Sequence, residues 1–306
     1  MAIEVDLHLH TTQSDGNLTP TQLIQLVASR GLRVVAITDH DITDALPEAF
    51  EAARAYPQLT LIPGVELSTD IPGNEIHMLG HYIDYRDSGF QATMKEFRDG
   101  RVGRAQEMVR KLAKLGMPVD WERVVEIAGE GTIGRPHIAQ ALVEKGYFEY
   151  PQQAFERHLG RNGLAYAERE KMTPQQATEL IVAAGGVPSL AHPAQLEGID
   201  DIIQDLKRHG LSGMEVYYAE YDDETRARLL AIAERHGLLP VGGSDYHAFG
   251  TPGEHLPGEM GPPMEVAVRL KELADANARA RAMRLLTSKA LQHTDTAPLS
   301  HSAEQV

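Results

Sequence analysis

The feature that most constrains the fold is an alternation of short apolar runs with amphipathic segments of helical period. The runs that are typical of strands occupy residues 3–10, 33–38, 59–62, 76–83, 187–191, 214–218 and 240–242. Segments with helical periodicity separate most of them, at residues 20–31, 44–56, 174–185, 199–210 and 222–236. Short connections between such elements need parallel strands with helical crossovers, so the pattern predicts an α/β barrel.

Between residues 88 and 168 the alternation stops, and no strand-like run occurs. We interpret residues 88–168 as an all-helical insertion that caps the substrate, with the barrel formed by residues 1–87 and 169–288. Residues 289–306 are rich in Thr, Ser, His and Gln and are predicted to form a flexible tail. The expected organisation is therefore a discontinuous barrel, an inserted helical unit and a tail.

Composition excludes several classes of protein. The chain has 306 residues and no cysteine, which rules out disulfide scaffolds and thiolate metal sites. Its formal net charge is −15, from 29 Lys and Arg against 44 Asp and Glu, and such a surface repels duplex nucleic acid. The apolar runs fall short of the roughly 18 residues of a membrane helix, and the N-terminal sequence MAIEVDLHLH lacks the features of a signal peptide. We therefore expect a cytoplasmic protein that makes no membrane contact.

Histidines and carboxylates gather where the predicted strands end. His8 and His10 close the first strand, and residues two apart on a strand point to the same face. His40, Glu66 and His192 each follow a later strand. Chemistry in parallel barrels is located at the carboxyl ends of the strands, so these side chains are candidate ligands. The complete set is His8, His10, Asp15, His40, Glu66, His77, His192, Asp245 and His247.

Imidazole and carboxylate groups without sulfur suit zinc, manganese or iron. Nine candidate ligands are too many for one ion, and they predict two or three ions that share a bridging carboxylate. His77 fits least well, because it lies near the start of its predicted strand. We interpret His81 as structural. Asp39 and Asp41 are interpreted as residues that orient neighbouring histidines or cap the following helix.

Six ordered motifs resemble those of the PHP (polymerase and histidinol phosphatase) family. They are His8-Leu9-His10 with Asp15-Gly16, Thr38-Asp39-His40, Gly64-Val65-Glu66, His77, Ala191-His192-Pro193 and Ser244-Asp245-Tyr246-His247. The resemblance implies a distorted (β/α)7 barrel with three divalent ions, most often Mn²⁺, with Fe²⁺ or Zn²⁺ as alternatives. One ion would be held by His8, His10, Glu66 and Asp245. A second would be held by Glu66, His77 and His192, and a third by Asp15, His40 and His247.

Three divalent ions outweigh three carboxylates, so such a site would be positive within an acidic protein. A positive site with open coordination positions suits a phosphate. The implied nucleophile is a metal-bridging hydroxide held at Glu66 and Asp245, with His192 and His247 beside it. The sequence singles out no general acid for the leaving oxygen.

The insertion carries the candidates for substrate binding. Arg135 and His137 begin a predicted helix, whose free N–H groups suit an anion, and a guanidinium can bind phosphate through two donors. Arg101 and Arg104 are three residues apart and present one basic face if they lie on a helix. The other basic residues considered in the insertion and just after it are interpreted as solvating, namely Arg157, Arg161 and Lys171.

The run Gly134-Arg135-Pro136-His137, with Leu159-Gly160 and Ala165-Tyr166, further resembles one subgroup of the PHP family. That subgroup contains nucleoside 3′,5′-bisphosphate phosphatases and enzymes that trim 5′-phosphorylated oligonucleotides. The resemblance implies that 3′-phosphoadenosine 5′-phosphate is cleaved to AMP and phosphate, with Arg135 and His137 on the phosphates. Three alternatives stay open: a 5′→3′ exonuclease on very short RNA, a phosphatase on another monoester such as histidinol phosphate, and a non-catalytic metal- or nucleotide-binding module.

Overall fold

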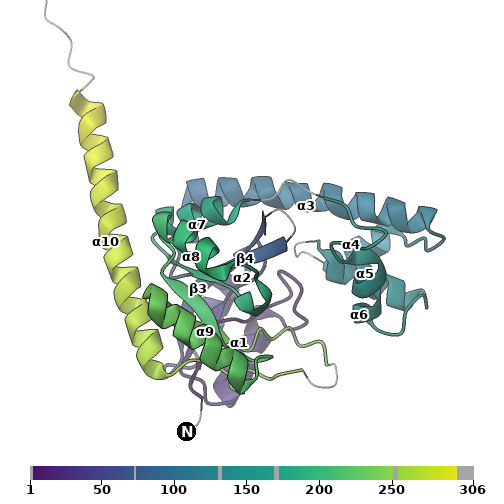
Figure 1. Ribbon diagram of the computed structural model, residues 1–306, viewed down its shortest axis with the longest axis horizontal. Helices are drawn as coiled ribbons and strands as arrows, with labels where there is room; N and C mark the ends of the chain where they lie inside the picture. The colour runs from purple at the N-terminus through teal and green to yellow at the C-terminus, as the bar shows by residue number, and fades with distance from the viewer. Residues whose placement is uncertain (1–2, 72–73, 130–132, 169–171, 251–253, 295–306) are drawn as a thin grey trace, which may run out of the picture.

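The computed structural model describes residues 3–71, 74–129, 133–168, 172–250 and 254–294 (Figure 1). Seven strands in these ranges form one sheet, in sequence order from first to last. They are β1 (Val5–Asp6), β2 (Val34–Ile37), β3 (Thr60–Ile71), β4 (Asn74–His81), β5 (Val187–Leu190), β6 (Gly213–Tyr218) and β7 (Leu239–Gly243). Leu7 N donates to Gly242 O at 3.1 Å and Asp245 N donates to His8 O at 3.0 Å, which joins the two ends of the sheet. The predicted (β/α)7 barrel is confirmed.

Strand β4 runs antiparallel to both of its neighbours, which corrects the expectation of an all-parallel sheet. It pairs with β3 from Gly64 opposite His81 to Ile71 opposite Asn74. An antiparallel strand begins at the edge of the sheet where its parallel neighbours end. His77 therefore lies at the same edge as the other candidate ligands, although it is near the start of its strand.

Strand β3 is longer than the sequence pattern predicts. Thr60 to Pro63 pair in parallel with β2, and the segment from Gly64 onward pairs with β4 as a hairpin. Glu66 consequently lies inside a strand rather than in a loop after one. It forms an isolated parallel bridge with His40 on one side and pairs with Leu79 of β4 on the other, so its backbone is held from both sides, and the residue is only 1% exposed.

Five helices connect the strands around the barrel: α1 (Pro20–Ser29), α2 (Ala45–Ala53), α7 (Pro174–Ala183), α8 (Ile199–Arg208) and α9 (Asp223–His236). Both α1 and α7 begin with a Thr-Pro pair. The hydroxyls of Thr19 and Thr173 accept from the amide N–H of the residue three positions on, at 3.2 Å in each case. Proline at the first helical position loses no hydrogen bond, so the Thr-Pro pair determines where α1 and α7 each begin.

The insertion is helical in its described part. It contains α3 (Ser88–Lys114), α4 (Trp121–Ala128), α5 (Arg135–Glu144), α6 (Pro151–Ala154) and a π-helical turn (Phe155–Leu159). These elements share a small apolar core that is separate from the barrel core and includes Met108, Leu112, Val124, Ile138, Leu142 and Leu159. Phe90 and Met94, in the first turns of α3, pack instead in the barrel core. Helix α3 therefore joins the two units, as Figure 1 shows along its upper edge.

A 31-residue helix, α10 (Met264–Thr294), ends the described chain. Its first half packs on the barrel through Val266, Leu270 and Ala274, and its second half projects away from the body (Figure 1). The helix continues six residues into the segment 289–306 that is predicted to form a flexible tail, and residues 295–306 of that segment lie outside the described ranges. Neither α10 nor any other helix in those ranges combines the length and apolar character needed to cross a bilayer.

Candidate metal centre

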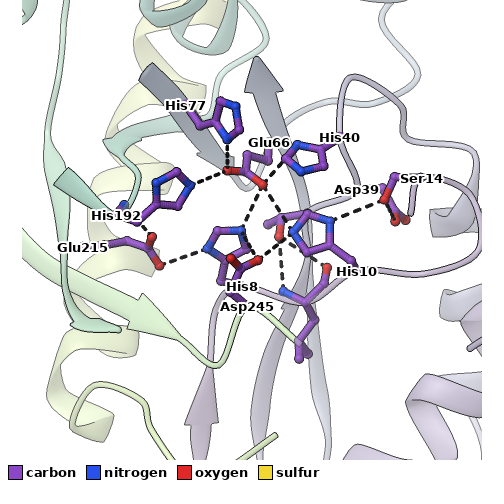
Figure 2. Close-up of polar contacts among 12 residues, drawn as sticks. His8, His10, Ser14, Asp39, His40, Glu66, His77, His192, Glu215 and Asp245 are labelled. Carbon is purple, nitrogen blue, oxygen red and sulfur yellow. Dashed lines mark hydrogen bonds and ion pairs between the residues drawn. The ribbon is translucent and has the colours of Figure 1, made fainter. Parts of the chain in front are cut away.

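The barrel brings the nine candidate ligands to one edge of the sheet. Figure 2 shows the histidines that converge on Glu66, namely His8, His10, His40, His77 and His192. His8 and His10 belong to the segment after β1, and both are almost fully buried. The Nε2 atom of His8 lies 3.0 Å from Glu66 Oε2 and 3.1 Å from Asp245 Oδ1. For His10 Nε2 the corresponding distances are 3.2 Å and 3.0 Å. Two imidazoles and two carboxylates thus face a common point.

A second group forms on the other side of His10. His247 Nε2 lies 3.3 Å from Asp15 Oδ1, and His40 Nε2 lies 3.8 Å from Asp15 Oδ2. Ligand atoms of His10, Asp15, His40 and His247 all lie within 4.8 Å of one another, which is the spacing of groups around one cation.

Glu66 also joins a third group. Its Oε1 atom lies 2.8 Å from His77 Nδ1 and 3.1 Å from His192 Nε2. The set whose atoms lie mutually within 4.8 Å contains His40, Glu66 and His77. His192 contacts the same Glu66 oxygen as His77, and Glu66 belongs to both the first and the third group.

Backbone geometry at two candidate ligands is unusual. His192 and Asp245 have φ angles of +29° and +52°, in the left-handed region that residues with a Cβ rarely adopt. Each such residue costs on the order of 1–3 kcal/mol and persists only where its surroundings enforce it. Here the main chain turns sharply after β5 and β7, and both turns aim their side chains inward.

Burial and neighbouring charges set the protonation states. Burial disfavours the imidazolium form of His10, but the nearby carboxylates of Asp245 and Glu66 outweigh this effect and raise the pKa of His10 to about 10. Burial lowers the pKa of His40 to about 3. Burial would raise the pKa of Glu66, but the surrounding histidines outweigh it and hold that pKa well below its usual range. The Glu66 carboxylate is therefore ionised, and the proton that His10 retains occupies a position that a metal cation can take.

Four buried ligand atoms lack a hydrogen bond of acceptable geometry within the described structure: His10 Nε2, Asp15 Oδ1, His40 Nδ1 and Asp245 Oδ1. Leaving a buried polar atom without a partner costs about 1–3 kcal/mol. All four belong to the converging groups, and their chemistry is imidazole and carboxylate, which bind divalent transition ions. The donor set therefore fits metal ions, and metal coordination would satisfy these atoms.

The basic residues of the insertion reach the same place. Arg104 on α3 and Arg135 on α5 line one cavity together with Asp15, His40 and His77. Arg135 Nη2 donates to Glu75 Oε2 at 2.7 Å, and Arg104 Nε donates to Ala167 O at 2.8 Å. The cavity thus has candidate metal ligands on one wall and guanidinium groups on the other.

The two remaining predicted binding residues behave differently. His137 is 8% exposed, and its Nδ1 accepts from Gly134 N at 3.0 Å, so this atom caps α5. Its ring lines a second, neighbouring cavity. Arg101 lies on α3, but its side chain is outside the described part of the structure.

Comparison with known proteins gives a family. The PHP domain model matches residues 6–115. The chain is 34% identical to the 5′-3′ exoribonuclease Rnm of Salmonella typhimurium, over 80% of this chain and 86% of that protein. It is 32% identical to the 3′,5′-nucleoside bisphosphate phosphatase of Chromobacterium violaceum, over 82% and 90%. The chain belongs to the PHP domain family.

A solved structure of a relative has the same fold as this chain. The solved structure of a putative metal-dependent phosphoesterase from Bifidobacterium adolescentis superposes with a TM-score of 0.80 at 32% identity, covering 88% of this chain and 96% of that one. The phosphoribosyl 1,2-cyclic phosphate 1,2-diphosphodiesterase of Eggerthella lenta is 30% identical over 79% of this chain and 93% of that protein. The chain is accordingly a metal-dependent PHP phosphoesterase, and its relatives carry several substrate names.

One buried carboxylate of this PHP site, Glu215, is not among the candidates predicted from the sequence. Glu215, on β6, is fully buried, and its Oε1 accepts from His8 Nδ1 at 3.0 Å while its Oε2 accepts from His192 N at 2.8 Å. The available signal was a carboxylate inside the apolar run 214–218. Asp39 contacts a candidate ligand indirectly, through Ser14. It accepts a hydrogen bond from Ser14 Oγ at 2.6 Å, and that hydroxyl lies 3.3 Å from His10 Nδ1.

Proposed function

We propose that this PHP enzyme hydrolyses the 3′-phosphate of nucleoside 3′,5′-bisphosphates, converting 3′-phosphoadenosine 5′-phosphate to AMP and phosphate. One observation carries the proposal: Arg104 and Arg135 line the same cavity as Asp15, His40 and His77. A substrate with two phosphates can place one at the metal ligands and the other at the arginines. The single phosphate of histidinol phosphate would leave the arginines unused.

The arginines are held in place before substrate binds. Glu75, on β4, pairs with Arg135 at 2.7 Å and lies 3.9 Å from Arg104 Nη2. Arg104 also lies over the Tyr166 ring, and Arg135 lies over the Phe155 ring, at 5.0 and 5.8 Å from the ring centroids. Planar guanidinium groups fixed in this way are suited to two-donor contacts with a phosphate.

We propose three divalent ions, most often Mn²⁺. The sets of residues that would hold them are His8, His10, Glu66 and Asp245 for the first, Glu66, His77 and His192 for the second, and Asp15, His40 and His247 for the third. When bound, such ions supply Lewis acidity to the phosphate and a hydroxide nucleophile near neutral pH. Glu66 would be shared between ions, because its two oxygens face different histidines. Tyr218 donates its hydroxyl to Asp245 Oδ2 at 2.9 Å and thereby fixes the orientation of that carboxylate.

A second candidate function is 5′→3′ trimming of short 5′-phosphorylated oligonucleotides, which the name of the Salmonella typhimurium relative favours. Both reactions break the bond between phosphorus and the 3′ oxygen of a nucleotide that carries a 5′-phosphate. The arginine cavity would bind that 5′-phosphate in either case, so the two functions differ only in what is attached beyond the scissile phosphate.

The Arg135→Ala variant tests the role of the cavity. Removing a charge-assisted contact to phosphate costs about 1.5–3 kcal/mol, so kcat/KM for 3′-phosphoadenosine 5′-phosphate should fall about 10- to 150-fold. The fall should be smaller for p-nitrophenyl phosphate, which has a single phosphate. Arg123→Ala is the matched control, because Arg123 pairs with Glu126 and Glu144 on the surface of the insertion. Unchanged KM and kcat for the bisphosphate in Arg135→Ala would overturn the proposal.

A further inference from the structure

We infer that Phe249 is a stacking platform for the nucleobase of the substrate, in a second cavity beside the metal ligands. The inference rests on the proposed function, because it concerns the part of the same substrate that carries no phosphate. Phe249 would determine specificity for the base, a role that the chemistry of the metal centre does not require.

The second cavity adjoins the first at the candidate metal centre. It has a volume of about 1100 Å³ and lies between the barrel loop at residues 12–20 and the insertion. Asp15, Pro136 and Phe155 line both cavities, and His247 lines the second. A nucleotide with its phosphates in the first cavity therefore has space for its base in the second.

Phe249 presents an open aromatic ring to this space. It is 47% exposed, although it lies two residues after the candidate ligand His247. Its ring stacks on the His247 imidazole with centroids 5.0 Å apart and planes inclined by 16°. The backbone is fixed as well, because Glu254 accepts from Phe249 N at 2.8 Å and from Gly250 N at 2.7 Å. A large apolar ring held rigidly yet uncovered suits stacking with a planar ligand.

The charges of the two cavities differ. The described lining of the second cavity contains no lysine or arginine, and it includes Glu48 and Glu156. A phosphate would be repelled there and would prefer the cavity of Arg104 and Arg135. Side-chain amides also line the second cavity, from Gln13, Asn17, Gln140 and Gln152. Amides donate and accept hydrogen bonds, as the edges of bases do, so the lining suits an uncharged base.

The test compares ligands with and without a base. Manganese-loaded wild type, Phe249→Ala and Phe249→Trp are titrated calorimetrically with AMP and with inorganic phosphate. Base stacking on an aromatic side chain is worth about 1–3 kcal/mol, so Phe249→Ala should weaken AMP binding about 5- to 150-fold more than phosphate binding. Phe249→Trp should restore AMP binding. Tyr147→Ala, which removes an exposed ring outside the cavity lining, should match wild type.

Kinetics give a second readout. The ratio of kcat/KM for 3′-phosphoadenosine 5′-phosphate to that for p-nitrophenyl phosphate should fall in Phe249→Ala, mainly through KM. Equal losses of affinity for AMP and for phosphate in Phe249→Ala would show that Phe249 acts only by supporting His247, and would overturn the inference. The inference would also be overturned if wild type bound AMP no more tightly than phosphate. Selective loss of AMP binding in a protein that cleaves no bisphosphate would keep the base site and reject the proposed function.

Discussion

The Glu215 carboxylate fixes the tautomer of His8. A carboxylate only accepts, so the proton of the 3.0 Å contact is on His8 Nδ1, and Nε2 faces Glu66 and Asp245. The second oxygen accepts from His192 N, which steadies the sharp turn after β5. One buried side chain thus orients two candidate ligands that are 184 positions apart in sequence.

Glu215→Gln should therefore weaken metal binding. Loss of such an outer partner typically costs 10- to 100-fold in metal affinity or activity. We expect a loss of that size for Mn²⁺, measured by titration of the metal-free protein. Glu179→Gln is the control, because Glu179 also contacts a histidine, His209, at 2.7 Å, but on the surface. A variant with wild-type Mn²⁺ affinity and lowered thermal stability would show that Glu215 is structural only.

His81 should make stability depend on pH. Its Nε2 donates to Leu7 O at 2.9 Å, and its Nδ1 is buried without a hydrogen bond within the described structure. Burial lowers its pKa from 6.5 to about 4. The unfolded chain therefore takes up a proton below pH 6.5 that the folded chain refuses, and stability is lost as the pH falls from about 6.5 to about 4.

His81→Gln should remove that dependence. At pH 5 the effect amounts to about 2 kcal/mol, at 1.36 kcal/mol for each pH unit below 6.5. The free energy of unfolding of metal-free protein, measured in urea at pH 5 and pH 7.5, should thus fall less in the variant than in wild type. Parallel changes in the two proteins would contradict this explanation.

At the scale of elements, β3 changes its pairing at Gly64. A Cβ at this position would lie 2.8 Å from Ile37 O and 2.8 Å from Thr38 Cγ2, on the parallel side, and 3.2 Å from Gly80 O on the antiparallel side. Any larger residue here would therefore force the neighbouring atoms of β2 and the segment after it to shift. Glu66 follows two residues later, so the same glycine controls the position of the shared carboxylate.

Gly64→Ala should destabilise the fold. Overpacking in a closed core costs about 1–3 kcal/mol, and the melting temperature should fall accordingly. Gly103→Ala is the matched control, because a Cβ in this helical position meets nothing within 4 Å, and alanine should raise stability by up to about 1 kcal/mol. Equal melting temperatures for the two variants would show that the contacts at Gly64 relax without cost.

The sequence pattern predicted all seven strands but not the direction of β4, because apolar alternation carries no direction. His77 therefore fitted poorly until the hairpin with β3 was known. The pattern also missed α10, which exposes Met283 and Leu286 and has no buried side chain over residues 275–287 to set a period. Phe249 lies outside any regular element, so only the cavity gives it a role.

At the scale of the whole molecule, the distribution of charge matters more for binding a phosphate than the net charge does. The net charge of −15 conceals two arginines that line the same cavity as three of the candidate metal ligands. Periodicity placed Arg135 at a helix start, but a contact with Glu75, 60 positions away, could not be deduced from spacing. Likewise, His8 meets Glu215 across 207 positions. Local sequence predicts the elements and many ligands, whereas the partners that orient them depend on barrel closure.

The proposed hydrolysis of nucleoside 3′,5′-bisphosphates is tested most directly by measuring turnover. Manganese-loaded protein is given 3′-phosphoadenosine 5′-phosphate, histidinol phosphate or a 5′-phosphorylated trinucleotide, and products are separated by chromatography. We expect the highest kcat/KM for the bisphosphate, with AMP and phosphate as products, and loss of turnover when a chelator removes the metal. Faster cleavage of the trinucleotide or of histidinol phosphate, or no turnover of the bisphosphate, would contradict it.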